Sequence, residues 1–234
     1  MPVTPNAIDL TTLAAVKGWT GASGTADDQI VQDCITSFAA YVLHLTGRGP
    51  SDGTIPAGSP FVSPQAYNET YDGNGTARLF LRNWPIVSVA ALTIGPLVIP
   101  QSTAWNVPGW VIDGSAKSLS LRGGGGGRMQ GVLTIGFSFG PSPYWGGTGY
   151  RFGTGDPSDV QAVNVQYTAG FPTVPFDLEM TARKVVALNY KRKAWIGQKS
   201  QAMAAGAGTV VYGQWEMDPD CMRVIEHYKR RSMS

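Results

Sequence analysis

Apolar residues recur at steps of three and four between positions 30 and 45 of the chain. At 100° per residue such positions share one side of an α-helix, and polar residues such as Gln29 and Asp33 fall outside it. Thr25 suits the N-cap and Gly47 the stop of an amphipathic helix of about five turns, and a shorter helix is predicted at residues 8–16. The apolar stripe of the longer helix comprises Ile30, Val31, Cys34, Ile35, Phe38, Tyr41, Val42 and Leu45.

The middle of the chain has a different pattern, in which short β-branched and aromatic runs are separated by Gly- and Pro-rich turns. One such turn, Asp72-Gly73-Asn74-Gly75, leads into an alternating run. Many short strands with this punctuation favour an antiparallel sandwich or small barrel. The predicted strands span residues 77–81, 86–94, 105–112, 118–121, 132–139 and 162–167.

Helical patterns return near the C-terminus. Pro175 suits the first turn of a helix, and Asp177 beside it favours the positive end of the helix dipole. Gly197 ends this helix, residues 198–217 have a flexible composition, and Asp218-Pro219 supplies an N-cap and a first-turn proline for a last helix. The first of these helices has one apolar face, made of Leu178, Ala182, Val185, Val186 and Ile196.

Together these patterns predict an α+β protein. Neither helical block can bury its apolar stripe alone, so residues 1–47 and 171–234 are expected to form one helical bundle core. Residues 48–170 are then a large antiparallel β-sandwich or barrel-like insertion into that core.

Charge is unevenly distributed along the 234 residues, of which only 15% are charged. From Arg183 onward the chain has ten Lys/Arg and four Asp/Glu, a net charge of +6, whereas the residues before it carry a net charge of −4. A basic tail on a mildly acidic body predicts contact with a polyanion or with an acidic partner surface.

No catalytic or metal-binding signature stands out in the sequence. There are two histidines, of which His44 lies on the polar side of its helix and His227 lies beside charged neighbours in the last helix, so both are expected to be solvated. No HExxH, nucleophile-elbow or Walker A pattern occurs. We therefore expect a non-enzymatic protein without a cofactor or metal. With no apolar run near 18 residues and no signal peptide, it is expected to be made in the cytoplasm, with no membrane partner.

Several segments occur in an order that resembles a known family. Tyr71-Asp72-Gly73-Asn74-Gly75 leads into Leu79-Phe80-Leu81 and then Trp84-Pro85-Ile86-Val87-Ser88-Val89. Val165-Gln166-Tyr167-Thr168-Ala169-Gly170-Phe171 then precedes Pro175-Phe176-Asp177-Leu178 and a basic helix, and Ile225-Glu226-His227-Tyr228-Lys229-Arg230-Arg231 comes near the end. In this order around a helical core, they resemble the head–tail connector (adaptor or head-completion) proteins of tailed bacteriophages.

This resemblance implies a structural virion protein of the neck, the junction between head and tail, made in the host cytoplasm. It implies a ring of about twelve identical subunits beneath the portal, around a channel for double-stranded DNA. The expected partners are other copies of the chain, the portal protein, a stopper or tail-completion protein, and DNA bound without sequence preference.

Site residues follow as hypotheses from the resemblance and from charge. The portal-docking segment would be Met222, Arg223, Ile225, Tyr228, Lys229, Arg230 and Arg231. A basic set would face the DNA channel, the portal or only solvent, and comprises Arg183, Lys184, Lys191, Arg192 and Lys193. Aromatic residues for a subunit or tail interface would be Trp105, Trp110, Tyr144, Trp145 and Tyr150.

Three other functions remain open at this stage. The chain would fit another phage neck or tail component, such as a stopper or tail-completion protein. It would also fit a glycan-binding β-module, with sugars stacked on Trp105, Trp110, Tyr144 and Trp145. An enzyme ranks third, because the sequence offers no catalytic constellation.

Overall fold

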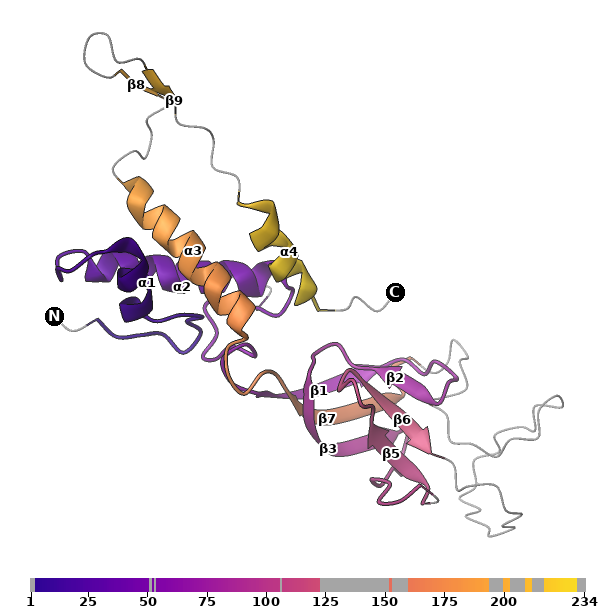
Figure 1. The fold of residues 1–234 in the computed structure, drawn as a ribbon. Helices are drawn as coiled ribbons and strands as arrows, with labels where there is room; N and C mark the ends of the chain where they lie inside the picture. Colours follow the sequence, from indigo (N-terminus) through magenta and orange to yellow (C-terminus); the bar gives the residue numbers. More distant parts are fainter. Residues whose placement is uncertain are drawn as a thin grey trace, which may run out of the picture. The chain divides into compact units, whose positions relative to one another are not determined.

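The structure is a computed structural model. It describes residues 3–50, 52, 54–105, 107–122, 152, 160–193, 200–202, 209–211 and 217–230. The chain divides into two compact units: a helical unit, Met1–Ser63 with Phe171–Arg230, and a sheet unit that includes Pro64–Gly170. The second unit is thus inserted in sequence between the two halves of the first (Figure 1).

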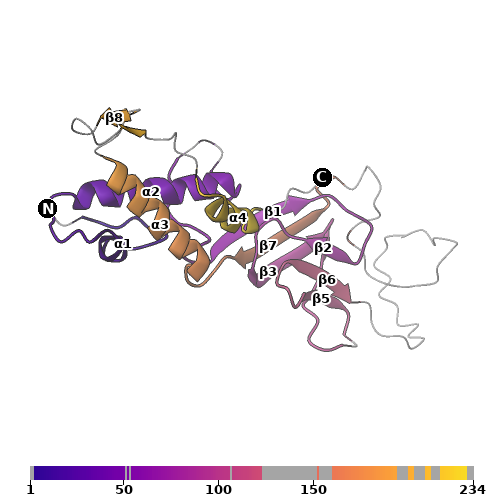
Figure 2. The ribbon, with the colours of Figure 1, turned by 45° about the horizontal axis from the view of Figure 1, so that its top comes forward.

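The described residues of the helical unit contain four helices. They are α1 (Leu13–Thr20), α2 (Asp28–Leu45), α3 (Phe176–Arg192) and α4 (Pro219–His227). α2 and α3 pack together, α1 contacts both, and α4 lies against α2 and α3 (Figure 2). The apolar faces predicted from the sequence are largely buried here, since Val31, Ile35, Val42, Leu178 and Val185 are each at most 2% exposed.

Two helix starts differ from the sequence prediction. Residues 8–12 are not helical: a turn lies at residues 7 and 8, where the Asn6 side chain accepts from the backbone N–H of Ile8, and irregular backbone follows up to Thr12. α1 instead begins after Thr12, whose hydroxyl accepts from the Ala15 N–H as an N-cap. α2 begins after Asp27 and not after Thr25.

In the described part of the sheet unit the strands form two antiparallel sheets. The first has the strand order β1-β7-β3-β4 and the second β2-β6-β5. Figure 1 shows β1, β7 and β3 side by side, with β6 and β5 lying over them. The strands are β1 (Gln65–Tyr71), β2 (Arg78–Phe80), β3 (Ile86–Ile94), β4 (Leu97–Val98), β5 (Gly109–Ile112), β6 (Ser118–Arg122) and β7 (Val163–Ala169).

One hydrophobic core joins the two sheets. Leu92 and Val165 of the first sheet are buried in it together with Leu119 of the second, and each has no exposed surface. Gly109 lies where β5 begins, at φ +152°, and a Cβ there would lie 2.5 Å from the Pro100 carbonyl oxygen. No other residue type fits this close approach of two backbone segments.

The mixed α+β class predicted from the sequence is therefore confirmed. The strands predicted at 86–94 and 118–121 are present, whereas the strand predicted at 105–112 begins only at Gly109. β1 and β4 were not predicted, and the strand expected at 132–139 lies outside the described residues. Among the helices that are described, none is long and apolar enough to cross a membrane.

Residues 198–217, for which the sequence predicts a flexible link, include one more strand pair. β8 (Ser200–Ala202) and β9 (Thr209–Val211) pair antiparallel and form a two-stranded sheet of their own.

Candidate functional site

The predicted basic residues in and after α3 differ in whether they have an acidic partner. Arg183 forms an ion pair with Glu179 one turn earlier and donates to the Thr11 hydroxyl. Lys184 forms an ion pair with Asp218, the N-cap residue of α4. Both cations are therefore paired with carboxylates of the helical unit, and of the two only Lys184 keeps a large exposed part, 43% of its side chain.

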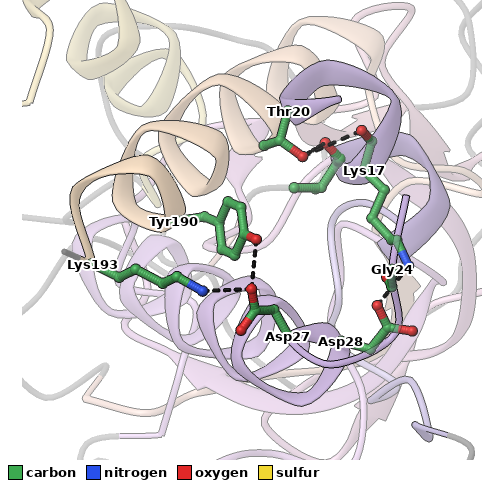
Figure 3. A network of polar contacts seen from close by, with 8 residues as sticks. Lys17, Thr20, Gly24, Asp27, Asp28, Tyr190 and Lys193 are labelled. Carbon is green, nitrogen blue, oxygen red and sulfur yellow. Dashed lines mark hydrogen bonds and ion pairs between the residues drawn. The ribbon is translucent and has the colours of Figure 1, made fainter. Parts of the chain in front are cut away.

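Lys193 belongs to a polar network where the end of α3 meets the start of α2 (Figure 3). Asp27 accepts from the Lys193 ammonium at 2.5 Å and from the Tyr190 hydroxyl at 2.8 Å. These hydrogen bonds, that from Lys193 first, lower the pKa of the Asp27 carboxyl and raise the pKa of Lys193. They also explain why Asp27 makes no side-chain cap to its own helix.

A second ion pair stabilises the loop between α1 and α2. Lys17 of α1 donates to Asp28 at 2.6 Å and to the Gly24 carbonyl at 2.6 Å (Figure 3). Both charged side chains are about four-fifths buried. Lys191 and Arg192 remain exposed at the end of α3, and they are the members of the predicted basic set best placed to meet an outside anion.

The Asp27 network gives a testable prediction about acid stability. A lowered pKa means that the folded state favours the carboxylate, so this stabilisation is present above about pH 4 and is lost as the pH falls through the folded pKa. Asp27→Asn should lower the urea midpoint at neutral pH, and its difference from the unmodified protein should shrink in acid. Asp33→Asn, at an exposed position of the same helix, is the matched control. A difference that stays constant down to pH 2 would argue against the network.

Part of the predicted portal-docking segment is buried in the helical unit. Within α4 and the residue after it, Ile225 is 1% exposed and Tyr228 is 6% exposed, so both belong to the core of the helical unit. Neither side chain is available to a partner while α4 keeps this position. Met222 is half-buried and Arg223 is exposed, with Asp220 as its ion-pair partner, whereas Arg231 lies outside the described residues.

Tyr228 is held by rings and by a hydrogen bond. Its ring meets those of Phe61 and Phe171 edge to face, at centroid distances of 5.8 and 5.5 Å. Its hydroxyl donates to the Asp177 carboxylate at 2.7 Å, and burial, together with this hydrogen bond, raises the pKa of the Tyr228 phenol. Tyr228 therefore joins the C-terminal end of α4 to the start of α3.

A basic cluster surrounds this aromatic contact. The Arg48 side chain donates to the Tyr228 carbonyl at 3.0 Å, and its guanidinium lies 5.4 Å from the centre of the Phe61 ring. The backbone N–H of Arg230 donates to the backbone carbonyl of Thr46 at 2.7 Å. These contacts bring Arg48, exposed Lys229 and half-buried Arg230 to the C-terminal ends of α2 and α4. We call Arg48, Lys229 and Arg230 the C-terminal basic cluster.

Sequence reasoning missed Arg48 and Phe61, because both lie about 170 residues before the segment that they contact. Only a weak signal in the sequence pointed to Arg48. It follows Gly47, the predicted end of a helix, and the negative end of the helix dipole stabilises a cation there.

The predicted aromatic interface is divided by the structure. Trp105 is 77% exposed and suits a contact with another molecule. Trp110 is 5% exposed and lies in the core of the sheet unit, so its assignment to an interface is corrected here. Tyr144, Trp145 and Tyr150 lie outside the described residues. Because Trp110 is buried, it also cannot be one of the four aromatic rings that the glycan-binding alternative would stack on sugars.

The sheet unit contains a carboxylate that is bound by two phenols. Glu69 of β1 accepts from the Tyr71 hydroxyl at 2.5 Å and from the Tyr167 hydroxyl at 2.6 Å. The two phenols in turn accept from the backbone N–H groups of Arg82 and Asn83. The network therefore fixes the loop after β2 on the sheet. Burial, as the leading cause, raises the pKa of both phenols well above the usual range.

The described residues offer little for small-molecule chemistry. They contain no group of three or more His, Cys, Asp or Glu placed to hold a metal. A hollow of about 340 Å³ in the helical unit is lined in part by Asp9 and Gln32. Both carboxylates that line it serve the fold: Asp9 accepts from the Thr36 and Gln32 side chains, and Glu179 forms an ion pair with Arg183.

The chain matches none of the protein-family models against which it was scanned, and no significant match was found among curated proteins.

Proposed function

We propose that this chain is a structural protein of a tailed-bacteriophage virion, a head–tail adaptor located at the neck. About twelve copies form a ring under the portal that extends the DNA channel and offers the tail its attachment surface. The helices act as a bundle core, with the sheets as a sandwich- or barrel-like insertion. The observation that carries this proposal is the C-terminal basic cluster, in which Arg48 joins Lys229 and Arg230.

The cluster supports a role in docking. Its three residues follow the C-terminal ends of two packed helices, α2 and α4, so an acidic partner surface at this place would meet the exposed Lys229 and the positive field of two arginines. The aromatic contacts of Tyr228 hold these cations in position before any partner binds, which lowers the entropy cost of docking. The exposed pair Lys191 and Arg192 would be the channel-facing part of the basic set, in contact with phosphates.

The test is to mix the purified protein with portal rings of the phage that encodes it, and to image the product. We expect density with about twelvefold symmetry beneath the portal. Lys229→Glu should weaken this complex, because it reverses an exposed charge of the cluster without touching the core. Arg122→Glu, which reverses an exposed charge in the sheet unit, is the matched control.

The possible outcomes distinguish an error in the proposed adaptor function from an error in the proposed docking site. If no complex forms with the portal, the adaptor function is wrong, and binding to a tail component instead would favour the stopper or tail-completion alternative. If Lys229→Glu binds as well as the unmodified protein, the docking site is wrong. Point variants are preferable to truncation after Asp218, because truncation would remove Ile225 and Tyr228 from the core.

A further inference from the structure

Trp105 is the most exposed large apolar side chain among the described residues, with 77% of its surface exposed. It lies in the loop between β4 and β5. Residues 83–112, which include this loop, contain no Asp, Glu, Lys, Arg or His. The cores of protein interfaces are likewise depleted in charge and enriched in aromatic residues, and Trp is one of the residue types that contribute most to binding. Trp105 is therefore suited to be the anchor of a contact with another protein surface.

The loop that carries Trp105 is held by hydrogen bonds on both sides of this residue. The hydroxyl of the buried Ser102 lies 2.8 Å from the carbonyl oxygens of both Ala104 and Val107, to which it donates. The Val107 N–H donates to the Ala104 carbonyl at 3.1 Å, and the Ser102 N–H donates to the Trp110 carbonyl at 2.9 Å. The backbone at Trp105 is thus positioned before any partner binds, which lowers the entropy cost of a contact.

The hollow in the helical unit matches an indole ring in size and chemistry. Its volume is about 340 Å³, at the lower end of the range for ligand pockets. Leu10, Leu13 and Val174 supply apolar walls. Glu179, which also lines the hollow, uses one carboxylate oxygen, Oε1, for its ion pair with Arg183, so the other oxygen can accept a further hydrogen bond. An indole is apolar over most of its surface and has one N–H group, which only donates.

We propose that Trp105 of one copy of this chain inserts into the hollow in the helical unit of a second copy. Each copy carries one exposed ring and one hollow, on different units, so a second copy supplies the missing half. The contact is heterologous, and repeated contacts of this kind close into a ring or extend as a filament. It would join neighbours in the proposed ring but does not require the portal. An error in this contact and an error in the proposed docking site therefore appear in different experiments.

Complementation between two variants is the first test. Trp105→Ala removes the ring and keeps the hollow, whereas Thr173→Trp, at an exposed position that lines the hollow, fills the hollow and keeps the ring. At concentrations where the unmodified protein associates, each variant alone should remain at the monomer mass of 24.9 kDa. An equimolar mixture should form a dimer, because only one ring and one hollow remain for each pair of copies. Analytical ultracentrifugation measures the masses, and circular dichroism confirms that both variants are folded.

Two further variants serve as controls for the first test. Ser37→Trp adds a ring at an exposed position of α2 outside the hollow, so it should associate as the unmodified protein does. Trp105→Phe keeps an apolar ring but loses the indole N–H. It should weaken association less than Trp105→Ala, which should weaken it at least about tenfold.

Cross-linking identifies the two surfaces. With Cys34→Ser in every copy, Thr103→Cys on one copy and Thr173→Cys on another should form a disulfide-linked dimer, since both positions are exposed. It should form at least about tenfold faster than a pair of Val87→Cys and Thr173→Cys, because the contact raises the local thiol concentration. Val87, 52% exposed on β3, is the control position. Adding Trp105→Ala to the Thr103→Cys copy should slow the reaction to the rate of the control pair.

Any of four results would overturn the proposal. The unmodified protein stays monomeric at every concentration; or Trp105→Ala associates as strongly as the unmodified protein; or the mixture of the two variants stays monomeric; or a chain carrying both Thr103→Cys and Thr173→Cys forms the disulfide mainly within itself.

Discussion

Tyr228→Ala is expected to detach α4 from the helical unit, whereas Tyr228→Phe should leave it in place. The alanine variant loses the ring that packs against Phe61 and Phe171 in a nearly closed site. Truncating a buried aromatic side chain costs about 3–5 kcal/mol of unfolding free energy. The phenylalanine variant keeps the ring and loses only the hydrogen bond to Asp177, which costs about 1 kcal/mol.

Urea denaturation measures the two losses, and hydrogen exchange of α4 peptides shows where they act. In the alanine variant the amides of α4 should exchange much faster than those of α2. Binding to the proposed portal partner should weaken in parallel, because Tyr228 positions Lys229 and Arg230, which directly follow it. If the two variants are equally stable, the aromatic contacts do not hold α4.

The sequence predicted elements best where local chemistry and burial agree. β3 was predicted with its observed bounds, because five of its nine residues are β-branched and no Gly, Pro, Asn or Asp interrupts the run. The start of α4 was predicted from Asp218 and Pro219, and the Asp218 side chain does accept from the Asp220 N–H. A cap of this kind depends on neighbours in sequence, so no tertiary information is needed.

Prediction failed where a tertiary partner decides the structure. β1 reads Gln-Ala-Tyr-Asn-Glu-Thr-Tyr, a polar run without an apolar alternation. It forms a strand because the side chains of Glu69 and Tyr71 meet Tyr167 on β7. Asp27 likewise resembles a helix cap in sequence, but its carboxylate is bound by Tyr190 and Lys193. Both partners lie about 100 residues or more away in the chain.

The candidate site shows the same division. Charge counting located the basic C-terminal region, but it did not show that Arg183, Lys184 and Lys193 have acidic partners within the same unit. The excess positive charge is thus concentrated on fewer exposed residues than the sequence suggests. Trp110 could not be distinguished from Trp105 by sequence, since only the pleat of β5 turns Trp110 into the core.

The buried phenols of the sheet unit predict a loss of stability at alkaline pH. The pKa of Tyr71 and that of Tyr167 are raised by burial, so the folded state keeps both phenols protonated when the unfolded chain begins to ionise near pH 10. Above that pH the unfolded state binds fewer protons than the folded state, so the unfolding free energy falls as the pH rises. Each phenol contributes a slope of about 1.4 kcal/mol per pH unit until its folded pKa is reached. Below pH 10 the contribution is fully present.

Tyr167→Phe separates this effect from general alkaline unfolding. It removes one ionisable phenol while its ring stays beside Tyr67, so the slope above pH 10 should be about half that of the unmodified sheet unit. Hydrogen exchange of β7 peptides, measured between pH 9 and pH 11 and corrected for intrinsic exchange, gives the slope for this unit. An unchanged slope would show that the phenols already ionise freely in the folded protein.

Glu69→Ala tests the same network at neutral pH. It should lower the unfolding free energy more than Tyr167→Phe does. It removes the oxygen that accepts from both hydroxyl groups. The two hydroxyl oxygens lie 3.4 Å apart, so one can then donate to the other, and at least one buried donor is left without its acceptor. The cost is about 1–3 kcal/mol for each donor left unsatisfied, in addition to a looser loop at Arg82 and Asn83. Glu69→Gln keeps a carbonyl oxygen at this position and should recover part of the loss, because an amide oxygen accepts hydrogen bonds without the carboxylate charge.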